Sequence, residues 1–247
     1  MKSLIVANWK MNPESLKAAK KLLEATKKAA KVRGVSVIVC PPAVFLRDLA
    51  AKRGSVAFGA QNVHFENRGS FTGELSPLQI KDAKAAYVIV GHAERRKMGE
   101  TNDDVRKKVD AALAAFLTPI VCIGEESRGP GAEHFEYVRE QIRSCISEEA
   151  GKRLSKIIIA YEPVWAIGAP KPMLPAQMHE MTIFIRKTLV ERFGSAGHSA
   201  TILYGGAIDA GNAASMMRES DVSGLLVGRA SVDAAAFTEL LKVVSAA

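Results

Sequence analysis

Three side chains with acid–base or anion-binding chemistry each stand just after a short apolar run. His92 comes two residues after Val90, Glu162 directly follows Tyr161, and Lys10 lies shortly beyond the first apolar run. A carboxylate can take a proton as a general base, and an imidazole N–H can stabilise charge that develops on a substrate oxygen. An ammonium group beside them favours an anionic ligand. Together these residue types predict a site that moves a proton next to a carbonyl group.

Each of these residues also has a structural interpretation. Glu162 precedes a proline, so the chain turns at once and holds the carboxylate in place; alternatively, it is a rim carboxylate that pairs with a nearby cation. His92 precedes a helical stretch over residues 93–96, where the helix dipole disfavours an imidazolium; alternatively, it only supports the fold. Lys10 requires an anionic substrate or a carboxylate such as Glu94, because an unpaired buried ammonium is costly.

Two glycine-rich turns predict how a phosphate could be held. Gly205 with Gly206, and Gly228 with Arg229, each follow a late apolar run, and backbone N–H groups in such turns bind phosphate oxygens. Glu126, beyond the fifth run, is expected to face the same place. We therefore expect a small phosphate ester that carries a carbonyl group. Nothing in these residues calls for a nucleotide, a metal ion or a redox cofactor.

The elements that must position these residues alternate along the chain. Unbroken apolar stretches, typical of strands buried on both faces of a parallel sheet, occupy residues 4–7, 35–40, 56–59, 86–90, 119–123, 157–161, 200–204 and 224–227. Amphipathic stretches lie between them, and 102–116 and 175–193 are the clearest helices. Eight such units in 247 residues, with no linker, predict a single-domain closed (β/α)8 TIM barrel over residues 1–247. The carboxyl ends of its strands would share one mouth.

An open doubly wound sheet is the alternative architecture. It would usually place a Gly-x-Gly-x-x-Gly motif after the first strand, whereas this chain has Asn8-Trp9-Lys10-Met11-Asn12 there. A dinucleotide site is therefore not favoured.

Composition excludes several other classes of protein. The chain is 48% apolar and 24% charged, which is typical of a folded domain rather than a disordered one. No apolar run is long enough for a membrane helix or a secretory signal, so we expect a cytoplasmic protein. Cys40, Cys122 and Cys145 have neither disulfide nor metal-ligand spacing.

The net charge of +8 favours anionic partners such as phosphates. Much of the excess comes from lysines over residues 17–31, which we interpret as the solvated face of an amphipathic helix. We expect neither nucleic-acid binding nor membrane binding.

Seven stretches, in the same order along the chain, carry a resemblance to a known family. The most specific is Ala-Tyr-Glu-Pro-Val-Trp-Ala-Ile-Gly at 160–168, and the others lie at 7–12, 59–62, 71–74, 90–96, 122–125 and 226–228. The chain closely resembles the triosephosphate isomerase family over nearly its whole length. The resemblance implies interconversion of dihydroxyacetone phosphate and D-glyceraldehyde 3-phosphate, a step of glycolysis and gluconeogenesis, through an enediolate and without a cofactor.

The resemblance also implies roles for individual residues. Glu162 would move the proton between two carbons, and neutral His92 would polarise the substrate oxygens. Lys10 and Asn8 would complete their surroundings, and Glu94 would orient Lys10. The remaining implied ligands and supports are Gly168, Ala207, Gly228 and Arg229 at the phosphate, and Tyr204 as the latch of a lid over residues 163–173.

A loop over residues 61–74 resembles the family's dimer loop. Thr72 would reach the site of a second subunit, and Glu74 would pair with Arg95. The resemblance therefore implies a homodimer.

Two departures from the family pattern concern the lid latch. Ala207 replaces a serine whose hydroxyl helps to hold the closed lid, and Pro170 stands where the backbone N–H that it bonds would be. Removing both partners of a hydrogen bond can leave the free energy of the closed lid nearly unchanged, whereas removing one leaves the other partner unsatisfied. We interpret Ala207 and Pro170 as one coupled change. Pro170 and Pro172 also fix φ in the lid, which either reduces the disorder lost on closure or blocks it.

Two further departures lie beside the reacting groups. Ala93 replaces a serine that offers the catalytic carboxylate a resting hydrogen bond, which would free Glu162 toward its active position. Arg229 replaces a glycine, and its side chain would either add charge at the phosphate or obstruct it. The expectation is an isomerase with an altered lid latch. The alternative is a phosphate-binding relative with weak or no activity.

Overall fold

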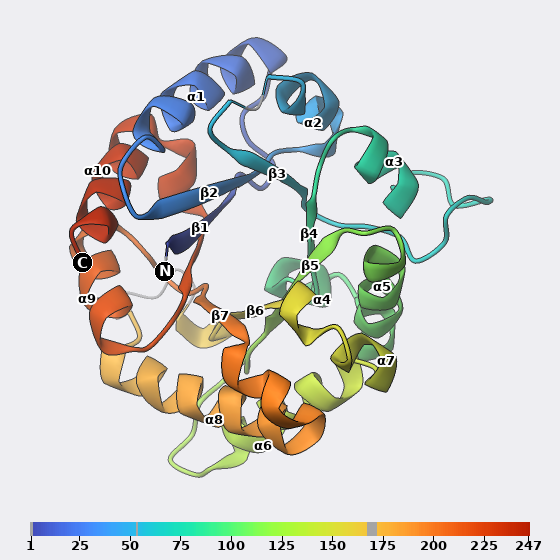
Figure 1. Cartoon of the computed structure of the whole chain (residues 1–247), viewed down its shortest axis with the longest axis vertical. Coiled ribbons are helices and arrows are strands. Elements are labelled where there is room, and N and C mark those ends of the chain that lie inside the picture. Colours follow the sequence, from blue (N-terminus) through green and yellow to red (C-terminus); the bar gives the residue numbers. More distant parts are fainter. Residues whose placement is uncertain (1, 53, 167–171) are drawn as a thin grey trace.

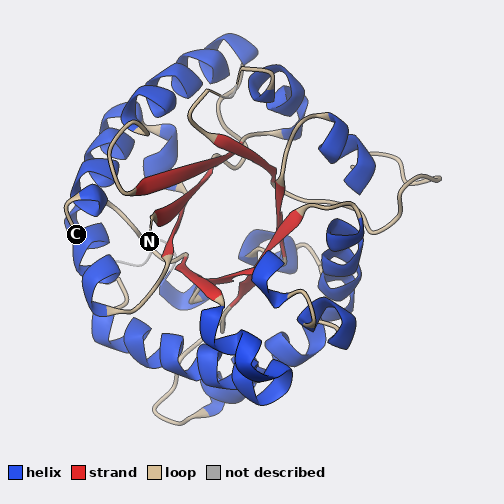
Figure 2. Ribbon diagram, viewed as in Figure 1, coloured by secondary structure: helices blue, strands red, loops and turns tan. Residues whose placement is uncertain are grey.

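Each apolar run expected to be a strand forms one in the computed structural model, which describes residues 2–52, 54–166 and 172–247. The strands pair in parallel and in chain order, and β1 also pairs with β8, so the sheet closes into a barrel (Figures 1 and 2). The predicted TIM barrel is thus confirmed. The strands are β1 (Ser3–Asn8), β2 (Val35–Cys40), β3 (Ala57–Ala60), β4 (Tyr87–Val90), β5 (Thr118–Ile123), β6 (Ile158–Tyr161), β7 (Thr201–Tyr204) and β8 (Gly224–Val227).

Helices surround the ring of strands (Figure 2). The α-helices are α1 (Leu16–Ala29), α2 (Ala43–Ala50), α3 (Pro77–Asp82), α4 (Ala93–Lys97), α5 (Asn102–Ala114), α6 (Glu133–Cys145), α7 (Glu148–Gly151), α8 (Pro175–Phe193), α9 (Ala210–Glu219) and α10 (Ala234–Ser245). Short 3-10 turns are η1 (Leu154–Lys156), η2 (Val164–Ala166), η3 (Gly194–Ser199) and η4 (Arg229–Val232).

Local backbone and capping features explain the bounds of the two helices that were predicted most clearly. Helix α8 has the predicted bounds and stops at Gly194, whose φ of 66° suits glycine. Helix α5 begins at Asn102 as predicted, with Thr101 as its N-cap, but it ends two residues early. Phe116 has a φ of 58° and is exposed, so it belongs to the turn into β5.

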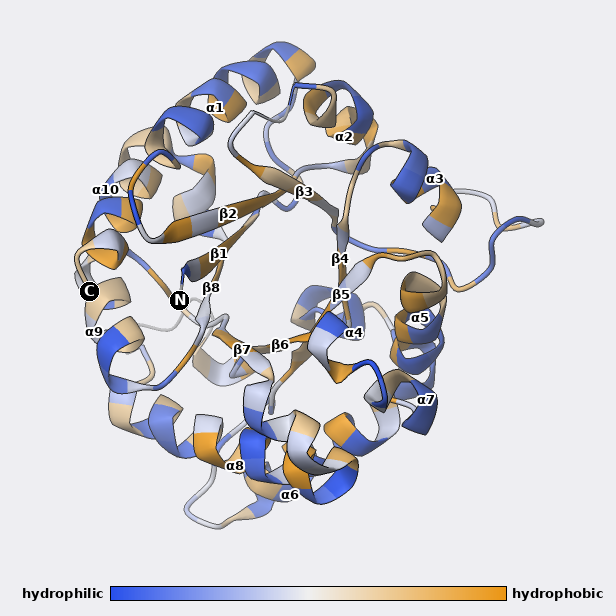
Figure 3. Cartoon of the chain, in the orientation of Figure 1, coloured by the Kyte–Doolittle hydropathy of each residue, from blue (hydrophilic) through white to orange (hydrophobic). Residues whose placement is uncertain are grey.

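The unbroken apolar runs are explained by burial on both strand faces. One cluster fills the barrel interior with residues such as Val6, Ile38, Ile120 and Leu226. A larger cluster lies between the strands and the inner faces of the helices. Outer helix surfaces are largely hydrophilic, whereas the strands are apolar (Figure 3). Each fully buried large apolar side chain contributes roughly 1.5–3 kcal/mol, so the two layers hold the strand ends in fixed positions.

Two features of the surface concern possible partners. No described helix combines the length and apolar character needed to cross a bilayer. The connection between β3 and α3 projects from the body of the barrel (Figure 1). This connection contains the expected dimer loop, and most of its residues from 66 to 74 are exposed.

Candidate active site

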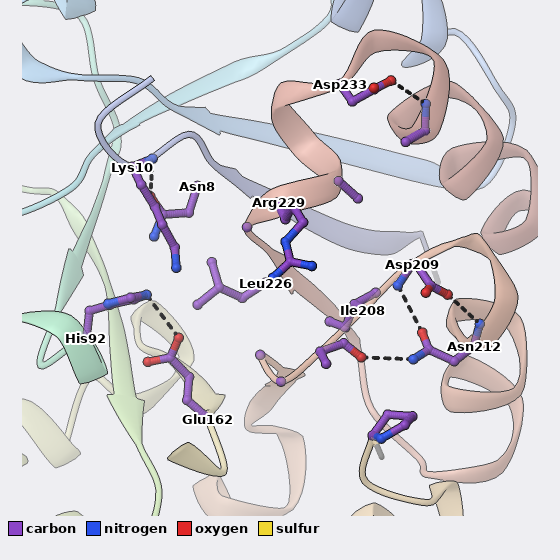
Figure 4. Close-up of a pocket in the computed structure, with 17 residues that line it drawn as sticks. Asn8, Lys10, His92, Glu162, Ile208, Asp209, Asn212, Leu226, Arg229 and Asp233 are labelled. Atoms are coloured by element: carbon purple, nitrogen blue, oxygen red, sulfur yellow. Dashed lines mark hydrogen bonds and ion pairs between the residues drawn. The ribbon is translucent and has the colours of Figure 1, made fainter. Parts of the chain in front are cut away.

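One cavity of about 550 Å³ opens where the carboxyl ends of the strands meet. Its lining comes from the segments that follow β1, β4, β6, β7 and β8, together with Asn8 at the end of β1 and Leu226 of β8. The lining residues expected from the sequence are Asn8, Lys10, His92, Glu162, Pro172, Gly205, Gly206, Ala207, Gly228 and Arg229. Segments far apart in sequence therefore bring the predicted acid–base and anion-binding groups together (Figure 4).

Glu162 and His92 face one another inside this cavity. His92 Nε2 lies 3.2 Å from Glu162 Oε1, and the two side chains are only 9% and 4% exposed. Figure 4 shows them pointing toward each other from neighbouring parts of the barrel mouth. A carboxylate and an imidazole at this distance can act on adjacent atoms of one small molecule.

The other ring nitrogen of His92 determines its tautomer. His92 is the N-cap of α4, and its Nδ1 accepts a hydrogen bond from the backbone N–H of Glu94 at 3.1 Å. An acceptor nitrogen carries no proton, so the neutral ring has its proton on Nε2, which faces Glu162. The imidazole can therefore donate a hydrogen bond into the cavity without being charged.

The backbone around Glu162 is fixed by close contacts. Its N–H donates to Ile123 O at 2.7 Å, and a Cβ at Gly124 would lie 2.0 Å from the carbonyl oxygen of Glu162. The carboxylate also accepts a hydrogen bond from the backbone N–H of Ala93 at 3.3 Å. Ala93 therefore offers the carboxylate a backbone donor, although it has no side-chain hydroxyl. Burial raises the pKa of the Cys122 thiol, and the charge of Glu162 adds to this.

Lys10 is held at the mouth from several directions. Its φ of 53° is uncommon for a residue with a side chain, and its N–H donates to Asn8 Oδ1 at 3.1 Å. Gln61 donates to the Lys10 carbonyl at 2.8 Å. Lys10 Nζ lies 2.5 Å from Glu94 Oε1, the carboxylate expected to orient it. Burial acts to raise the pKa of Glu94, but the hydrogen bond and charge of Lys10 outweigh burial and lower it.

The two glycine-rich turns expected to bind an anion also line the cavity. Ser231 Oγ donates to Gly228 O at 2.7 Å, and Asn212 donates to Ala207 O at 2.8 Å. A side-chain hydrogen bond therefore holds the backbone of each turn. The side chain of Arg229 points into the cavity (Figure 4). Gly168 and Pro170, the other residues expected here, lie outside the described residues.

Tyr204, the expected latch residue, is fully buried at the end of β7. Burial raises the pKa of its hydroxyl to about 12, and the backbone of Met173 acts in the opposite direction. Tyr204 therefore stays neutral at ordinary pH and lies beside a residue at the far end of the expected lid.

The expectation for Glu126 was wrong. Glu126 is exposed and lies outside the described lining of the cavity, whereas its neighbour Glu125 is 2% exposed. Glu125 accepts hydrogen bonds from Tyr161 and Trp165, each at 2.8 Å. The sequence held a signal for this, because Glu125 directly follows the glycine that ends the β5 segment.

Three residues of the lining, besides alanines, Leu226 and Asp233, were not predicted. They are Ile208, Asp209 and Asn212. Asp209 and Asp233 are N-caps whose side chains accept from the first backbone N–H groups of α9 and α10. An aspartate directly before an apolar helical stretch is a recognisable N-cap, and this pattern could have found Asp209.

The expected dimer residues are spread over two segments. Thr72 and Glu74 are exposed in the projecting loop, and Arg95 lies on α4 near the mouth. Within the described parts of the chain, the buried Nε atom of Arg95 has no hydrogen-bond partner. The same parts hold no group of three His, Cys, Asp or Glu side chains that could bind a metal ion.

Comparison with known proteins connects this geometry to a family. The family model described as Triosephosphate isomerase matches residues 3–244. A triosephosphate isomerase of Endomicrobium trichonymphae is 41% identical over 246 residues, which cover 98% of each chain. The crystal structure of triosephosphate isomerase from Bartonella henselae matches with a TM-score of 0.87 and 32% identity, over 98% of this chain and 99% of that one. The chain therefore belongs to the triosephosphate isomerase family, the intramolecular aldose–ketose isomerases whose fold it shares.

Proposed function

We propose that this isomerase interconverts dihydroxyacetone phosphate and D-glyceraldehyde 3-phosphate with Glu162 as the proton carrier. The observation that supports this most directly is the distance of 3.2 Å between Glu162 Oε1 and His92 Nε2, in a cavity that Lys10 also lines. A three-carbon phosphate ester that displaces this direct contact would meet a base on one side and an N–H donor on the other.

The proposed reaction moves one carbon-bound proton. Glu162 takes a proton from C1 of dihydroxyacetone phosphate, and the electrons of the broken C–H bond form the C1–C2 double bond of an enediolate. The N–H of His92 and the ammonium of Lys10 stabilise the charge on the oxygens. Glu162 then returns its proton to C2, while the C1 hydroxyl proton passes to the C2 oxygen, which gives the aldehyde. Burial of the pair excludes water from these steps.

The phosphate is proposed to lie against the two braced turns. Backbone N–H groups at Gly228, Arg229 and Ala207 would bind its oxygens, as would Gly168 in the lid. The Arg229 guanidinium would add a positive charge at the same end of the cavity. Asn8 would help Lys10 to place the reacting oxygens.

The lid latch is proposed to be altered in this chain. Ala207 has no hydroxyl and Pro170 has no N–H, so neither is left unsatisfied when the lid closes. Tyr204 beside Met173 would remain as a latch at the other end of the lid. The N–H of Ala93 would give Glu162 a weaker resting contact than the hydroxyl and N–H pair of a serine.

A homodimer built around the projecting loop is also proposed. Phe71 is 43% exposed near the loop tip, and Met11 beside the active-site mouth is 93% exposed. A second copy would cover these apolar side chains, with Thr72 near its active site and Glu74 at the Arg95 guanidinium. Sedimentation should show one species of twice the chain mass, and Glu74→Arg should weaken it. A monomeric parent protein would refute the dimer. The expected cytoplasmic location stays a prediction.

The proposed chemistry is tested with Glu162→Gln, which keeps the shape of the side chain and removes the base. We expect kcat for glyceraldehyde 3-phosphate to fall by about 10²- to 10⁴-fold, while phosphoglycolate still binds. Parental turnover in this variant would rule out Glu162 as the base. Phosphoglycolate binding by the parent protein without any turnover would indicate the non-catalytic alternative.

A further inference from the structure

A buried carboxylate lies behind the proposed base and does not face the cavity. Glu125 is 2% exposed and lies in the segment after β5. Both of its oxygens accept from the Tyr161 hydroxyl at 2.8 Å, and Oε1 also accepts from the Trp165 indole N–H at 2.8 Å. These donors stand on either side of Glu162 in the chain. Glu125 therefore ties together the residue before the base and the turn after it.

The backbone of Glu125 adds to this arrangement. Its carbonyl accepts the N–H of Val164 at 2.9 Å, at the start of η2. The next residue back, Gly124, leaves no room for a side chain against the Glu162 carbonyl. The segment after β5 thus determines where the backbone of the base lies.

Arg128 brings a positive charge to this carboxylate. Its Nε lies 3.3 Å from Glu125 Oε1, and a terminal nitrogen donates to the Tyr161 hydroxyl at 3.2 Å. Its guanidinium also lies 5.6 Å from the centre of the Trp165 ring, a cation–π distance. The Arg128 side chain is only 13% exposed, so this contact is largely shielded from water. The Arg128 side chain therefore contacts Glu125, Tyr161 and Trp165.

The charge of Glu125 requires such a partner. A carboxylate taken out of water is stabilised only by opposite charge and by hydrogen bonds to its oxygens. Among the ion pairs of the described residues, the cation that pairs with Glu125 is Arg128. Without Arg128, the buried carboxylate loses its ion pair and the Tyr161 hydroxyl loses one of its hydrogen-bond donors, so Glu125, Tyr161 and Trp165 are held together less firmly.

We propose that Arg128 is a positioning residue for the isomerisation. By pairing with Glu125, donating to Tyr161 and covering the Trp165 ring, it fixes the backbone that carries Glu162. It touches neither substrate nor reacting atoms in this role. The inference rests on the proposed function, because it takes Glu162 to be the base.

The test compares Arg128→Gln with a matched control on the outer surface. Arg139 also pairs with a glutamate three residues earlier, Glu136 at 3.0 Å, and lies 5.2 Å from the ring of Phe184. Arg139→Gln therefore removes the same kinds of contact away from the cavity. We expect kcat of Arg128→Gln to fall about tenfold with KM within about twofold, and Arg139→Gln to match the parent protein.

A spectroscopic readout separates positioning from general weakening of the fold. The chain has two tryptophans, and Trp9 is fully buried. Iodide should therefore quench Trp165 selectively, and we expect stronger quenching in Arg128→Gln than in the parent protein or in Arg139→Gln. A lower melting temperature with unchanged kcat and unchanged quenching would overturn the proposal. An equal fall in kcat in both variants would also overturn it.

Arg128→Lys keeps the inference testable if the glutamine variant does not fold. Lysine keeps the charge but cannot pair with Glu125, donate to Tyr161 and lie flat on the ring at once, so we expect kcat about threefold below the parent. Parental kcat and quenching in Arg128→Lys, with Arg128→Gln unfolded, would overturn the proposal. Glu162→Gln, measured alongside, tests the base separately: its full activity would defeat the proposed function, whereas its inactivity with a fully active Arg128→Gln would defeat only this inference.

Discussion

Gly205 lies directly against the side chain of Glu162. A Cβ atom at Gly205 would stand 2.8 Å from Glu162 Cγ and 3.5 Å from Oε1. Gly205 cannot easily move away, because its N–H donates to the carbonyl of Tyr161 at 2.8 Å. The first of the two glycine-rich turns predicted to hold phosphate thus has another effect, since it leaves the space that the base occupies.

Gly205→Ala should therefore displace the carboxylate of Glu162 from His92. We expect kcat to fall by about 10- to 100-fold, since a shift of this size at the reacting group is costly, while KM changes less. The measurement is steady-state kinetics in both directions of the reaction. Gly129→Ala is the matched control, because a Cβ there meets nothing within 4 Å. Parental kcat in Gly205→Ala would show that the contact is not restrictive.

The barrel and the reacting groups could be predicted because both follow from simple periodicity. Unbroken apolar runs identify strands that are buried on two faces. In a closed parallel barrel, the residues that follow the strands come together at one end of the barrel. His92 and Glu162 stand so close to their strands that an error of one residue in a strand end does not move them elsewhere. Their convergence in one cavity follows from topology alone.

Residues further into the loops could not be predicted in this way. Glu125 and Glu126 are adjacent and chemically alike, and the path of the chain at Gly124, pressed against the Glu162 carbonyl, decides which one is buried. Arg128 lies in an irregular segment without periodicity, so no sequence pattern predicts its contact with Trp165. The Lys10–Glu94 pair joins residues 84 positions apart and could be suggested only from the need to neutralise a cation.

Ala207→Ser tests whether the altered latch is one coupled change. A serine hydroxyl alone should raise turnover little, because Pro170 has no N–H to offer it. Ala207→Ser combined with Pro170→Gly should restore both partners, so its effect on kcat should exceed the sum of the single changes expressed as free energies. The measurement is a double-mutant cycle on kcat and KM. A large gain from Ala207→Ser alone would contradict the coupled change.

Glu94→Gln tests the ion pair that orients Lys10 through its pH dependence. The pKa of Glu94 is lower in the folded protein than in the unfolded chain, so its contribution to stability is complete above the ordinary glutamate pKa. That contribution is lost as the pH falls through the lowered value. Urea unfolding at about pH 7 and about pH 3 should show a smaller loss of stability on acidification in Glu94→Gln than in the parent protein. An identical loss in both would contradict this linkage.

The same variant should affect substrate binding. Lys10 without its carboxylate is less well placed, so we expect a several-fold higher KM at neutral pH. Glu24→Gln is the control, because Glu24 pairs with Lys27 at 2.8 Å on α1, outside the lining of the cavity. Its KM should equal that of the parent protein.

Arg229→Gly distinguishes added charge from obstruction at the phosphate end. Arg229 lines the cavity, and within the described residues no carboxylate forms an ion pair with it, so its charge is free to act on a dianionic phosphate. If the charge is useful, KM for glyceraldehyde 3-phosphate and the inhibition constant of phosphoglycolate should both rise about 10- to 100-fold in the glycine variant, the range for one charge-assisted hydrogen bond. Arg229→Lys should restore part of this affinity, and added salt should narrow the difference because it screens the charge. An unchanged or lower KM in Arg229→Gly would mean that the side chain obstructs the site, and that the backbone N–H groups of the turn bind the phosphate without its help.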